Sequence, residues 1–471
     1  MSLMVSISGI RGIVGSSLTP DVVVRYASAF AEFCNRGRIV IGRDGRSSGK
    51  PIAHLVSSTL VSMGCDVTAI GVCPTPTVQL AIEQRRAAGG ISITASHNPI
   101  IWNGLKFLDR TGMFLDADQH QRFVDIANSP QRIYALWDKM GSHEADDHYL
   151  DDHIKAILDL PYLNPRALRK RKFKVVVDCV NAAGSRIVPR LLAKLGCRVI
   201  EMNCDSSGVF AHDPEPIPQN LKSLCRRVRQ EKADLGIAVD PDVDRLVLIT
   251  ERGEPFGEEY TIAGVVKFIL EKEMAARTAR PKKRPGPLKV VTNLSTTRAV
   301  DDIAKSLGAE SIRTPVGEIN VAKKMKEVGA IVGGEGSGGV ILPSVHLGRD
   351  APVGIGITLQ HLAEFGGTLS ELKATMPQYS ITKSKIELGS LDPETALARI
   401  RSLYSNEGSV NTDDGLKLDF ADSWVHLRKS NTEPVLRIIA EARTRADADA
   451  LVATFSKSLS SSSSQSPGST L

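Results

Sequence analysis

Three copies of one strand-and-helix pattern make up most of this chain and limit what it can fold into. Each copy has an opening apolar run, a second run introduced by glycine, and a closing run that leads into a polar loop. The opening runs are residues 38–42, 174–178 and 289–292, the second runs are residues 64–70, 196–200 and 308–312, and the closing runs are residues 90–94, 235–239 and 330–332. Val/Ile runs separated by helical stretches are typical of mainly parallel sheets buried on both faces. Ligands of such sheets bind beyond the carboxyl ends of the strands, so we expect the three polar loops to share one cleft.

The pattern changes after about residue 373. Residues 380–388 and 415–420 alternate polar and apolar side chains, as half-buried antiparallel strands do, and residues 394–403 and 446–457 are helical in character. We therefore predict an α/β protein with three related, mainly parallel α/β domains and a smaller C-terminal α+β domain around a central cleft. The predicted domains are residues 1–153, 154–256, 257–372 and 373–457, followed by a Ser-rich tail, residues 458–471, that is expected to be disordered.

Composition and charge are those of an ordinary soluble protein. Hydrophobic residues make up 42% of the 471 residues and charged residues 24%, and no apolar run approaches a membrane span. The net charge of +6 is small for this length, and the basic, proline-broken residues 277–287 are interpreted as a surface loop rather than a nucleic-acid patch. The seven cysteines include no Cys-x-x-Cys pair, which favours reduced thiols. We expect a cytoplasmic protein with no nucleic-acid or membrane partner.

The second polar loop carries carboxylates at alternate positions, Asp240, Asp242 and Asp244. Like charges this close repel one another, and oxygen ligands of this kind suit Mg²⁺. An EF-hand is a competing interpretation because Glu251 falls at its last ligand position, but Arg245 stands where that loop needs glycine. A haloacid-dehalogenase-type phosphatase would use Asp240 as a nucleophile and leave the third carboxylate unexplained. A solvated acidic turn does not suit a site beside an apolar strand.

Two other loops offer hydroxyls and phosphate-binding side chains. Ser96 lies in Ala-Ser-His-Asn-Pro, where we expect it to present an exposed hydroxyl near glycines that permit close backbone approach. Arg428 and Arg437 flank small donors in a set that suits phosphate oxygens, the alternative being a polar turn between two strands. Residues 45–51 resemble a phosphate-binding P-loop but are one residue short, and residues 9–15 lack the dinucleotide fingerprint. Neither ATP nor NAD is expected.

Taken together, five motifs in order resemble the α-D-phosphohexomutase superfamily over residues 4–456. They are SGIRGIVG (8–15), TASHNP (94–99), DPDVDR (240–245), GGEGSGG (333–339) and RKSNTEP (428–434). The resemblance implies that Ser96 carries a phosphate and binds Mg²⁺ together with Asp240, Asp242 and Asp244. It also implies that Arg11, Arg245 and Lys106 lie near Ser96, with Lys106 a candidate for proton transfer. Glu335 and Ser337 would bind the sugar hydroxyls. The second phosphate would be bound by Arg428, Ser430, Asn431 and Thr432.

The implied enzyme is an intramolecular phosphotransferase that interconverts hexose or hexosamine 6-phosphate and 1-phosphate. A hexose 1,6-bisphosphate would be its intermediate and activator, and the protein would be a monomer or homodimer. Gly339 and Glu318 stand where the phosphomannomutase/phosphoglucomutase branch tends to carry His, which favours glucosamine 6-phosphate as substrate and leaves that branch as the alternative. Glu318 is expected either to contact the amino group of the sugar or to stabilise the N-terminus of the helix over residues 319–328. Outside this chemistry, a phosphatase and a catalytically silent sugar-phosphate binding protein are the other candidates.

Overall fold

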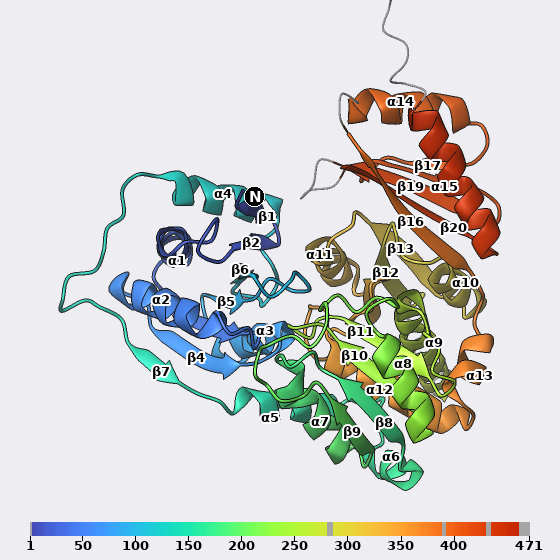
Figure 1. The fold of residues 1–471 in the computed structure, drawn as a ribbon, viewed down its shortest axis with the longest axis horizontal. Helices are drawn as coiled ribbons and strands as arrows, with labels where there is room; N and C mark the ends of the chain where they lie inside the picture. Colours follow the sequence, from blue (N-terminus) through green and yellow to red (C-terminus); the bar gives the residue numbers. More distant parts are fainter. Residues whose placement is uncertain (1, 280–285, 389–391, 430–434, 461–471) are drawn as a thin grey trace, which may run out of the picture.

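The computed structural model describes residues 2–279, 286–388, 392–429 and 435–460. Within these residues the chain forms four sheets, three with parallel strands at their centres and one that is antiparallel throughout. In Figure 1 the first sheet lies on the left, the C-terminal sheet at the upper right, and the second and third sheets below the C-terminal one. The predicted α/β class with a smaller C-terminal α+β domain is confirmed.

The first sheet has seven strands in the order β1-β2-β6-β5-β3-β4-β7. β3 pairs in parallel with both β4 and β5, whereas β6 returns antiparallel beside β5. Its strands are β1 (Met4–Ser6), β2 (Gly9–Ile13), β3 (Ile39–Arg43), β4 (Val67–Val72), β5 (Gly89–Ile93), β6 (Trp102–Asp109) and β7 (His143–Ala145), and its helices are α1 (Pro20–Phe33), α2 (Gly49–Ser62), α3 (Thr75–Arg85) and α4 (Ala117–Asn128).

The second and third sheets repeat the core of the first. The orders β6-β5-β3-β4, β11-β10-β8-β9 and β15-β14-β12-β13 are equivalent, with one antiparallel strand after each closing strand. The second sheet contains β8 (Lys174–Asp178), β9 (Arg198–Met202), β10 (Leu235–Val239) and β11 (Leu246–Thr250), with α5 (Tyr149–Leu158), α6 (Pro165–Arg171), α7 (Gly184–Lys194) and α8 (Lys222–Glu231). The third contains β12 (Lys289–Asn293), β13 (Glu310–Thr314), β14 (Val332–Glu335) and β15 (Gly339–Ile341), with α9 (Glu258–Ala279), α10 (Ala299–Ser306), α11 (Glu318–Val328), α12 (Ala351–Phe365) and α13 (Leu369–Ala374).

The three polar loops occupy one topological place. Each is the turn from the closing parallel strand to the antiparallel strand beside it: β5 to β6, β10 to β11, and β14 to β15. The parallel strands of one sheet end at the same edge, so each turn lies at the edge where α/β sheets bind ligands. The predicted repeat is therefore confirmed, and the added antiparallel strand makes each loop the connection of a hairpin.

The C-terminal domain is a separate packing unit. Its antiparallel sheet has the order β16-β20-β19-β18-β17, and its apolar core, which includes Leu427 and Phe455, is distinct from the large core shared by the first three sheets. The elements are β16 (Ser380–Glu387), α14 (Pro393–Tyr404), β17 (Ser409–Asn411), β18 (Leu416–Asp419), β19 (Trp424–Lys429), β20 (Val435–Ala442) and α15 (Arg445–Ser460). Helix α15 continues past residue 457, where we expected the tail to begin, and residues 461–471 lie outside the described part of the chain.

Two further sequence expectations can be compared with the fold. Residues 277–279, assigned to a basic loop, form the last turn of α9, and residues 280–285 lie outside the described residues. All seven cysteines are free thiols. Among the described helices, none is both long enough and apolar enough to cross a bilayer.

Gly104 in β6 marks a place where two strands and the Ser96 loop crowd together. A Cβ atom there would lie 2.3 Å from the carbonyl oxygen of Ile10 and 2.9 Å from that of Thr94, contacts that only glycine avoids. We expect Gly104→Ala to lower the free energy of unfolding by about 1–3 kcal/mol, measured by urea denaturation. Gly264→Ala in α9 is the matched control, because its nearest new contact is 3.8 Å away at Met376 and a helix favours alanine. Equal stability of the two variants would contradict this account.

Candidate active site

Ser96 lies in the first polar loop, between β5 and β6. Its φ of +51° is a left-handed conformation that a serine seldom adopts, and such strain is common at functional sites. The side chain is buried, with 2% exposure, and not exposed as its loop position suggested, because the second polar loop closes over it. The Ser96 hydroxyl oxygen lies 3.1 Å from Nδ1 of His97 and 3.3 Å from Oδ2 of Asp240.

A buried ion pair holds the Ser96 loop from beneath. Arg46 is fully buried and donates Nε to Oδ2 of Asp44 at 2.9 Å. Its Nη2 donates to the carbonyl oxygens of Ser96 and of Asn98, the latter at 2.9 Å. Asp44 also accepts a hydrogen bond from the Thr94 hydroxyl at 2.6 Å. Sequence reasoning missed Arg46, although it lies in the stretch compared with a P-loop, because its partners are backbone carbonyls distant in sequence.

The second polar loop brings three buried carboxylates together. Asp240, Asp242 and Asp244 are each at most 1% exposed, and they can offer oxygen atoms that lie within 4.8 Å of one another. Val243 between them has a φ of +61°, a genuine strain for a β-branched residue. The loop therefore brings three carboxylates together, and the strained backbone of Val243 is the energetic cost of this arrangement.

These carboxylates fit a divalent cation. Oδ1 of Asp242 and Oδ1 of Asp244 are buried and have no hydrogen-bond partner in the described part of the chain. Burial, together with the charges of Asp244 and Asp242, raises the pKa of Asp240 well above its ordinary value. A bound cation would satisfy the orphan oxygens and allow all three groups to ionise. The site is therefore a candidate metal centre with an oxygen donor set.

Lys106 of β6 partly neutralises this loop. Its ammonium nitrogen donates to Oδ2 of Asp242 at 2.6 Å and to Oδ2 of Asp244 at 3.2 Å. Burial alone would lower the pKa of Lys106, but the two carboxylates outweigh it and raise that pKa. The Thr75 hydroxyl, at the start of α3, also donates to Oδ2 of Asp242, at 2.8 Å. Thus the first domain binds the Oδ2 atoms of Asp242 and Asp244 and leaves the Oδ1 atoms of these two residues for a ligand.

Arg11 lies beside the Ser96 loop, and Arg245 lies beside the three aspartates. Nη1 of Arg11 donates to the Asn98 side chain at 3.2 Å, next to the Ser96 turn, and burial lowers the pKa of Arg11. Nε of Arg245 lies 3.8 Å from Oδ1 of Asp244. The charge of Arg245, then burial and Arg11, lower the pKa of His97 well below its ordinary value. The imidazole beside Ser96 is therefore neutral near pH 7.

The third polar loop fixes Glu335 by both oxygens. Glu335 ends β14, and its Oε1 accepts hydrogen bonds from Nδ2 of Asn293 at 2.8 Å and from the backbone N–H of Gly317 at 3.1 Å. Its Oε2 accepts from Nη1 of Arg349 at 2.7 Å. Ser337 is half-buried in the turn that follows. A carboxylate and a hydroxyl in one turn are suited to sugar hydroxyl groups.

Arg349 was not found from the sequence, because no motif contains it. Its Nη2 donates to Oδ2 of Asp244 at 2.7 Å, and its Nε donates to Oε2 of Glu318 at 3.0 Å. Glu318 is the first residue of α11, as one of the two interpretations expected, but its carboxylate is bound by Arg349 and, at 3.3 Å, by Gln79. The sugar loop, the metal loop and α11 are thus joined by one guanidinium.

The predicted phosphate loop is described only at its edges. Nε of Arg428, in β19, lies 3.1 Å from Oδ2 of Asp414. The same oxygen accepts a hydrogen bond from the backbone N–H of Val316 at 2.9 Å. Arg437 is exposed on β20, directly opposite Arg428 in the antiparallel register. Three predicted residues lie outside the described residues: Ser430, Asn431 and Thr432.

A second cluster of metal-ligand types joins three domains below the site. Nε2 of His153 and Nε2 of His346 lie 2.7 Å and 2.9 Å from the same Oδ2 atom of Asp350. Nδ1 of His153 lies 2.9 Å from the Thr77 hydroxyl. These are hydrogen-bond distances, and Oδ1 of Asp350 caps α12 through the N–H of Val353. The hydrogen bonds of the cluster link α3, α5 and α12, and one of its atoms, Nδ1 of His346, is buried without a hydrogen-bond partner in the described residues.

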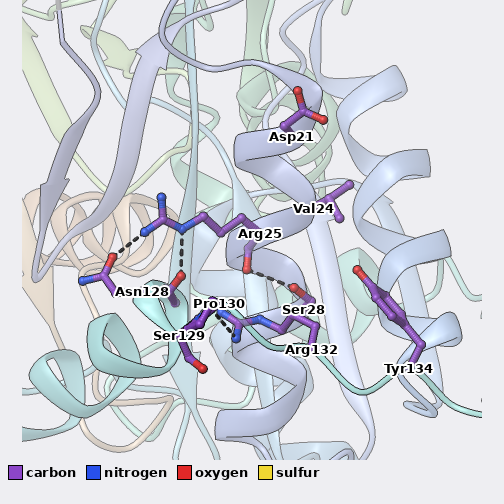
Figure 2. A pocket seen from close by; sticks show the side chains of 10 residues that line it. Asp21, Val24, Arg25, Ser28, Asn128, Ser129, Pro130, Arg132 and Tyr134 are labelled. Atoms are coloured by element: carbon purple, nitrogen blue, oxygen red, sulfur yellow. Dashed lines mark hydrogen bonds between the residues drawn. The ribbon is translucent and has the colours of Figure 1, made fainter.

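A surface cavity lies elsewhere. Its volume is about 470 Å³, and it opens between α1 and the segment after α4 (Figure 2). Dashed lines mark the hydrogen bonds from Nε of Arg25 to the carbonyl oxygen of Ala127, at the end of α4, and from Nη1 of Arg132 to the carbonyl oxygen of Ser129, just after it. None of the predicted site residues lines this cavity.

Comparison with known proteins identifies the family. Phosphoglucomutase/phosphomannomutase alpha/beta/alpha domain I matches residues 4–132, domain II residues 148–253, domain III residues 266–379, and the C-terminal domain residues 386–458. A probable phosphoglucosamine mutase of Methanopyrus kandleri is 37% identical over 442 residues, 93% of each chain. A phosphoglucomutase/phosphomannomutase of Thermococcus kodakarensis is 37% identical over 443 residues, 93% of this chain and 94% of that one.

A solved structure agrees with these matches. The crystal structure of a phosphoglucomutase/phosphomannomutase family protein from Burkholderia thailandensis superposes with a TM-score of 0.83 at 26% identity, covering 99% of this chain and 100% of that one. The chain belongs to the phosphoglucomutase/phosphomannomutase family of the α-D-phosphohexomutase superfamily. It is a phosphosugar mutase, an intramolecular phosphotransferase of the isomerase class. Nothing in these matches supports a haloacid-dehalogenase-type phosphatase.

The metal loop leads to a direct test. Asp242→Asn keeps the shape of the side chain and removes one charge from the cluster, so we expect it to weaken Mg²⁺ binding at least about tenfold. A ligand that binds only the folded protein raises the melting temperature. Mg²⁺ should therefore raise the Tm of the wild type, and the same concentration should raise that of the variant less. Excess chelator should stop turnover, and added Mg²⁺ should restore it. Full activity in chelator would exclude a metal at this site.

Proposed function

We propose that this mutase interconverts hexosamine 6-phosphate and hexosamine 1-phosphate, with glucosamine 6-phosphate as its preferred substrate. The observation that carries the proposal is the approach of the Ser96 hydroxyl oxygen to 3.3 Å from Oδ2 of Asp240, inside a buried carboxylate cluster. A phosphate ester on Ser96 would share a divalent cation with this cluster. Action on mannose and glucose phosphates is the second candidate, because the Thermococcus relative is named for it.

In the proposed cycle Ser96 gives up one phosphoryl group and recovers another. A free sugar hydroxyl attacks the phosphorus of the phosphoserine, the bond from phosphorus to the Ser96 oxygen breaks, and a bisphosphate forms. The bisphosphate turns around, the Ser96 oxygen attacks its other phosphorus, and the sugar oxygen leaves. In each step one hydroxyl loses a proton and one oxygen gains it. Lys106 is the proposed proton carrier, since its ammonium group donates to Asp242 and Asp244 of the loop whose Asp240 contacts Ser96.

Positioning and charge neutralisation account for most catalysis of phosphoryl transfer. Mg²⁺, proposed to bind Asp240, Asp242, Asp244 and the phosphate on Ser96, would supply Lewis-acid neutralisation of the phosphoryl oxygens. The chain's own contributions are the strained Ser96 turn and the cations Arg11 and Arg245 beside it. They would hold the phosphate ester in one orientation and disperse its charge.

The sugar and its second phosphate are assigned to the other two loops. Glu335 and Ser337 are proposed to bind the sugar hydroxyls. Arg428 and Arg437, which are directly opposite one another in the antiparallel register, are proposed to bind the distal phosphate because Arg428 belongs to the family's phosphate motif and Arg437 adds a second cation beside it. Ser430, Asn431 and Thr432 are proposed for the same phosphate on the family resemblance alone.

The preference for an amino sugar rests on charge. Three buried carboxylates, those of Asp244, Glu318 and Glu335, surround the guanidinium of Arg349, and Glu318 and Glu335 are paired with it rather than with Lys106. A sugar that carries an ammonium group adds a positive charge to this acidic surrounding, and a charge-assisted hydrogen bond contributes roughly 1.5–3 kcal/mol. The names of several relatives as probable phosphoglucosamine mutases support the same substrate. Glu318 and Glu335 both bind Arg349; we assign Glu318, at the start of α11, to positioning, and Glu335, which lies in the sugar-loop motif, to the sugar.

Ser96→Ala tests the carrier. We expect turnover to fall below detection while the fold is kept, since the substitution removes one hydroxyl and its weak contacts. Intact-mass measurement should show one phosphate on the wild type after treatment with hexose 1,6-bisphosphate and none on the variant. Activity of the variant near that of the wild type would refute the mechanism, and steady release of inorganic phosphate by the wild type would favour a hydrolase.

A side-by-side assay tests the substrate. We expect kcat/KM on glucosamine phosphate to exceed that on mannose and glucose phosphates about tenfold to a hundredfold, each measured with its cognate bisphosphate. Glu318→Gln should lower kcat/KM on all three sugars in proportion, because Glu318 acts through Arg349. A loss confined to glucosamine phosphate would instead show that Glu318 contacts the amino group. Equal rates of the wild type on all three sugars would contradict the preference for glucosamine phosphate and favour a phosphomannomutase/phosphoglucomutase.

A further inference from the structure

Gly339, the last residue of the sugar loop, leaves a space that another side chain fills. A Cβ atom at Gly339 would lie 2.3 Å from Cδ and 2.9 Å from Cγ of Arg349, far inside van der Waals contact. A side chain at position 339 and the stem of Arg349 therefore exclude each other. Arg349 can therefore extend to the active-site carboxylates only because residue 339 is a glycine.

Arg349 then uses each of its three nitrogen atoms on a different carboxylate. Nη2 lies 2.7 Å from Oδ2 of Asp244, Nη1 lies 2.7 Å from Oε2 of Glu335, and Nε lies 3.0 Å from Oε2 of Glu318. The acids come from the metal loop, the sugar loop and the first turn of α11, and all three are buried. The planar guanidinium presents its donors in a fixed fork, so it sets the relative positions of all three.

The backbone that carries Arg349 is itself held in place. The next residue, Asp350, accepts hydrogen bonds from His153 and His346 and caps α12. The N–H of Asp350 donates to the carbonyl oxygen of Val340, and the N–H of Ala351 donates to that of Val243. Arg349 therefore starts from a point anchored to both of the loops that its side chain joins.

We propose that Arg349 is a positioning residue of this mutase, which locks the metal loop to the sugar loop, and that Gly339 is retained to admit it. The inference rests on the proposed function, in which Asp244 binds the metal and Glu335 binds the sugar. Arg349 holds Oδ2 of Asp244, whose Oδ1 has no hydrogen-bond partner in the described residues, and it holds Oε2 of Glu335, whose Oε1 is fixed by Asn293 and Gly317. It fixes the position of the metal loop relative to the sugar loop.

The charge of Arg349 is permanent in this setting. Burial would lower its pKa, but Asp244, Glu335 and Glu318 outweigh burial and raise it. An arginine so placed does not accept protons, so proton transfer belongs to other groups. Its removal also makes the metal loop more negative, which favours cation binding there. A positioning role therefore predicts that turnover and metal affinity change in opposite directions.

Arg349→Met keeps an aliphatic side chain of similar length and removes the guanidinium group. Arg349→Lys keeps the positive charge but not the planar arrangement of donors. We expect kcat/KM on glucosamine 6-phosphate to fall roughly 100-fold in the methionine variant, with little recovery in the lysine variant. Binding of Mn²⁺, followed by electron paramagnetic resonance without any turnover, should stay equal or become tighter in the methionine variant. Parallel loss of Mn²⁺ binding and of the folded state would overturn the proposal in favour of a structural role. Activity near that of the wild type would overturn it outright.

Two further measurements separate positioning from folding. Guanidinium chloride, at a concentration too low to denature, should restore part of the activity of Arg349→Ala, and urea, its neutral analogue, should not; rescue by neither overturns the proposal. Gly339→Ala should lose activity as Arg349→Met does, whereas Gly264→Ala should match the wild type. An active Gly339→Ala would contradict the steric argument. A wild type inactive on every hexose phosphate would sink the proposed function, whereas an active wild type with an equally active methionine variant would sink only this inference.

Discussion

The mutual repulsion of buried carboxylates is the constraint on which the rest of this structure depends. Asp240, Asp242 and Asp244 lie within 4.8 Å of one another and out of contact with water. Such a cluster persists only if cations meet it from several directions. Lys106 arrives from the first sheet and Arg349 from the segment before α12, and orphan oxygens remain for a metal. The docking of the first three domains is therefore coupled to the chemistry of the site.

The repeated sheet makes this meeting of charges feasible. Each of the first three domains contributes the same hairpin turn, at the same edge of an equivalent sheet. The reactive hydroxyl, the carboxylates and the sugar loop are thus versions of one structural position with different side chains. The strain at Ser96 and at Val243 shows that two of these turns are held in conformations that their residues do not favour. Hydrogen bonds from Arg46 hold the Ser96 turn, and packing in the shared core holds Val243.

The C-terminal domain contacts the third domain through polar groups, and its apolar core is separate from the core that the first three domains share. Its links to the third domain include Arg298 with Asp419 at 3.2 Å and Ser295 with His426 at 2.8 Å. An interface of this kind allows relative motion of domains more readily than an apolar one. This suits a domain proposed to bind the distal phosphate of a substrate that must turn around during the reaction.

The sequence by itself determined the class of fold, the three equivalent polar loops and the family, because strand periodicity and short motifs are local features. It placed β8 and β10 at their observed bounds and identified Ser96 and the three aspartates that the fold brings together. Only the tertiary structure decided how the charges are matched. Arg46 and Arg349 bind partners distant in sequence, and the burial of Ser96 depends on a loop from another domain. The contacts of Arg46 follow from packing within the first domain, whereas those of Arg349 and the burial of Ser96 follow from how the domains dock, and docking arises from the whole core rather than from any one segment.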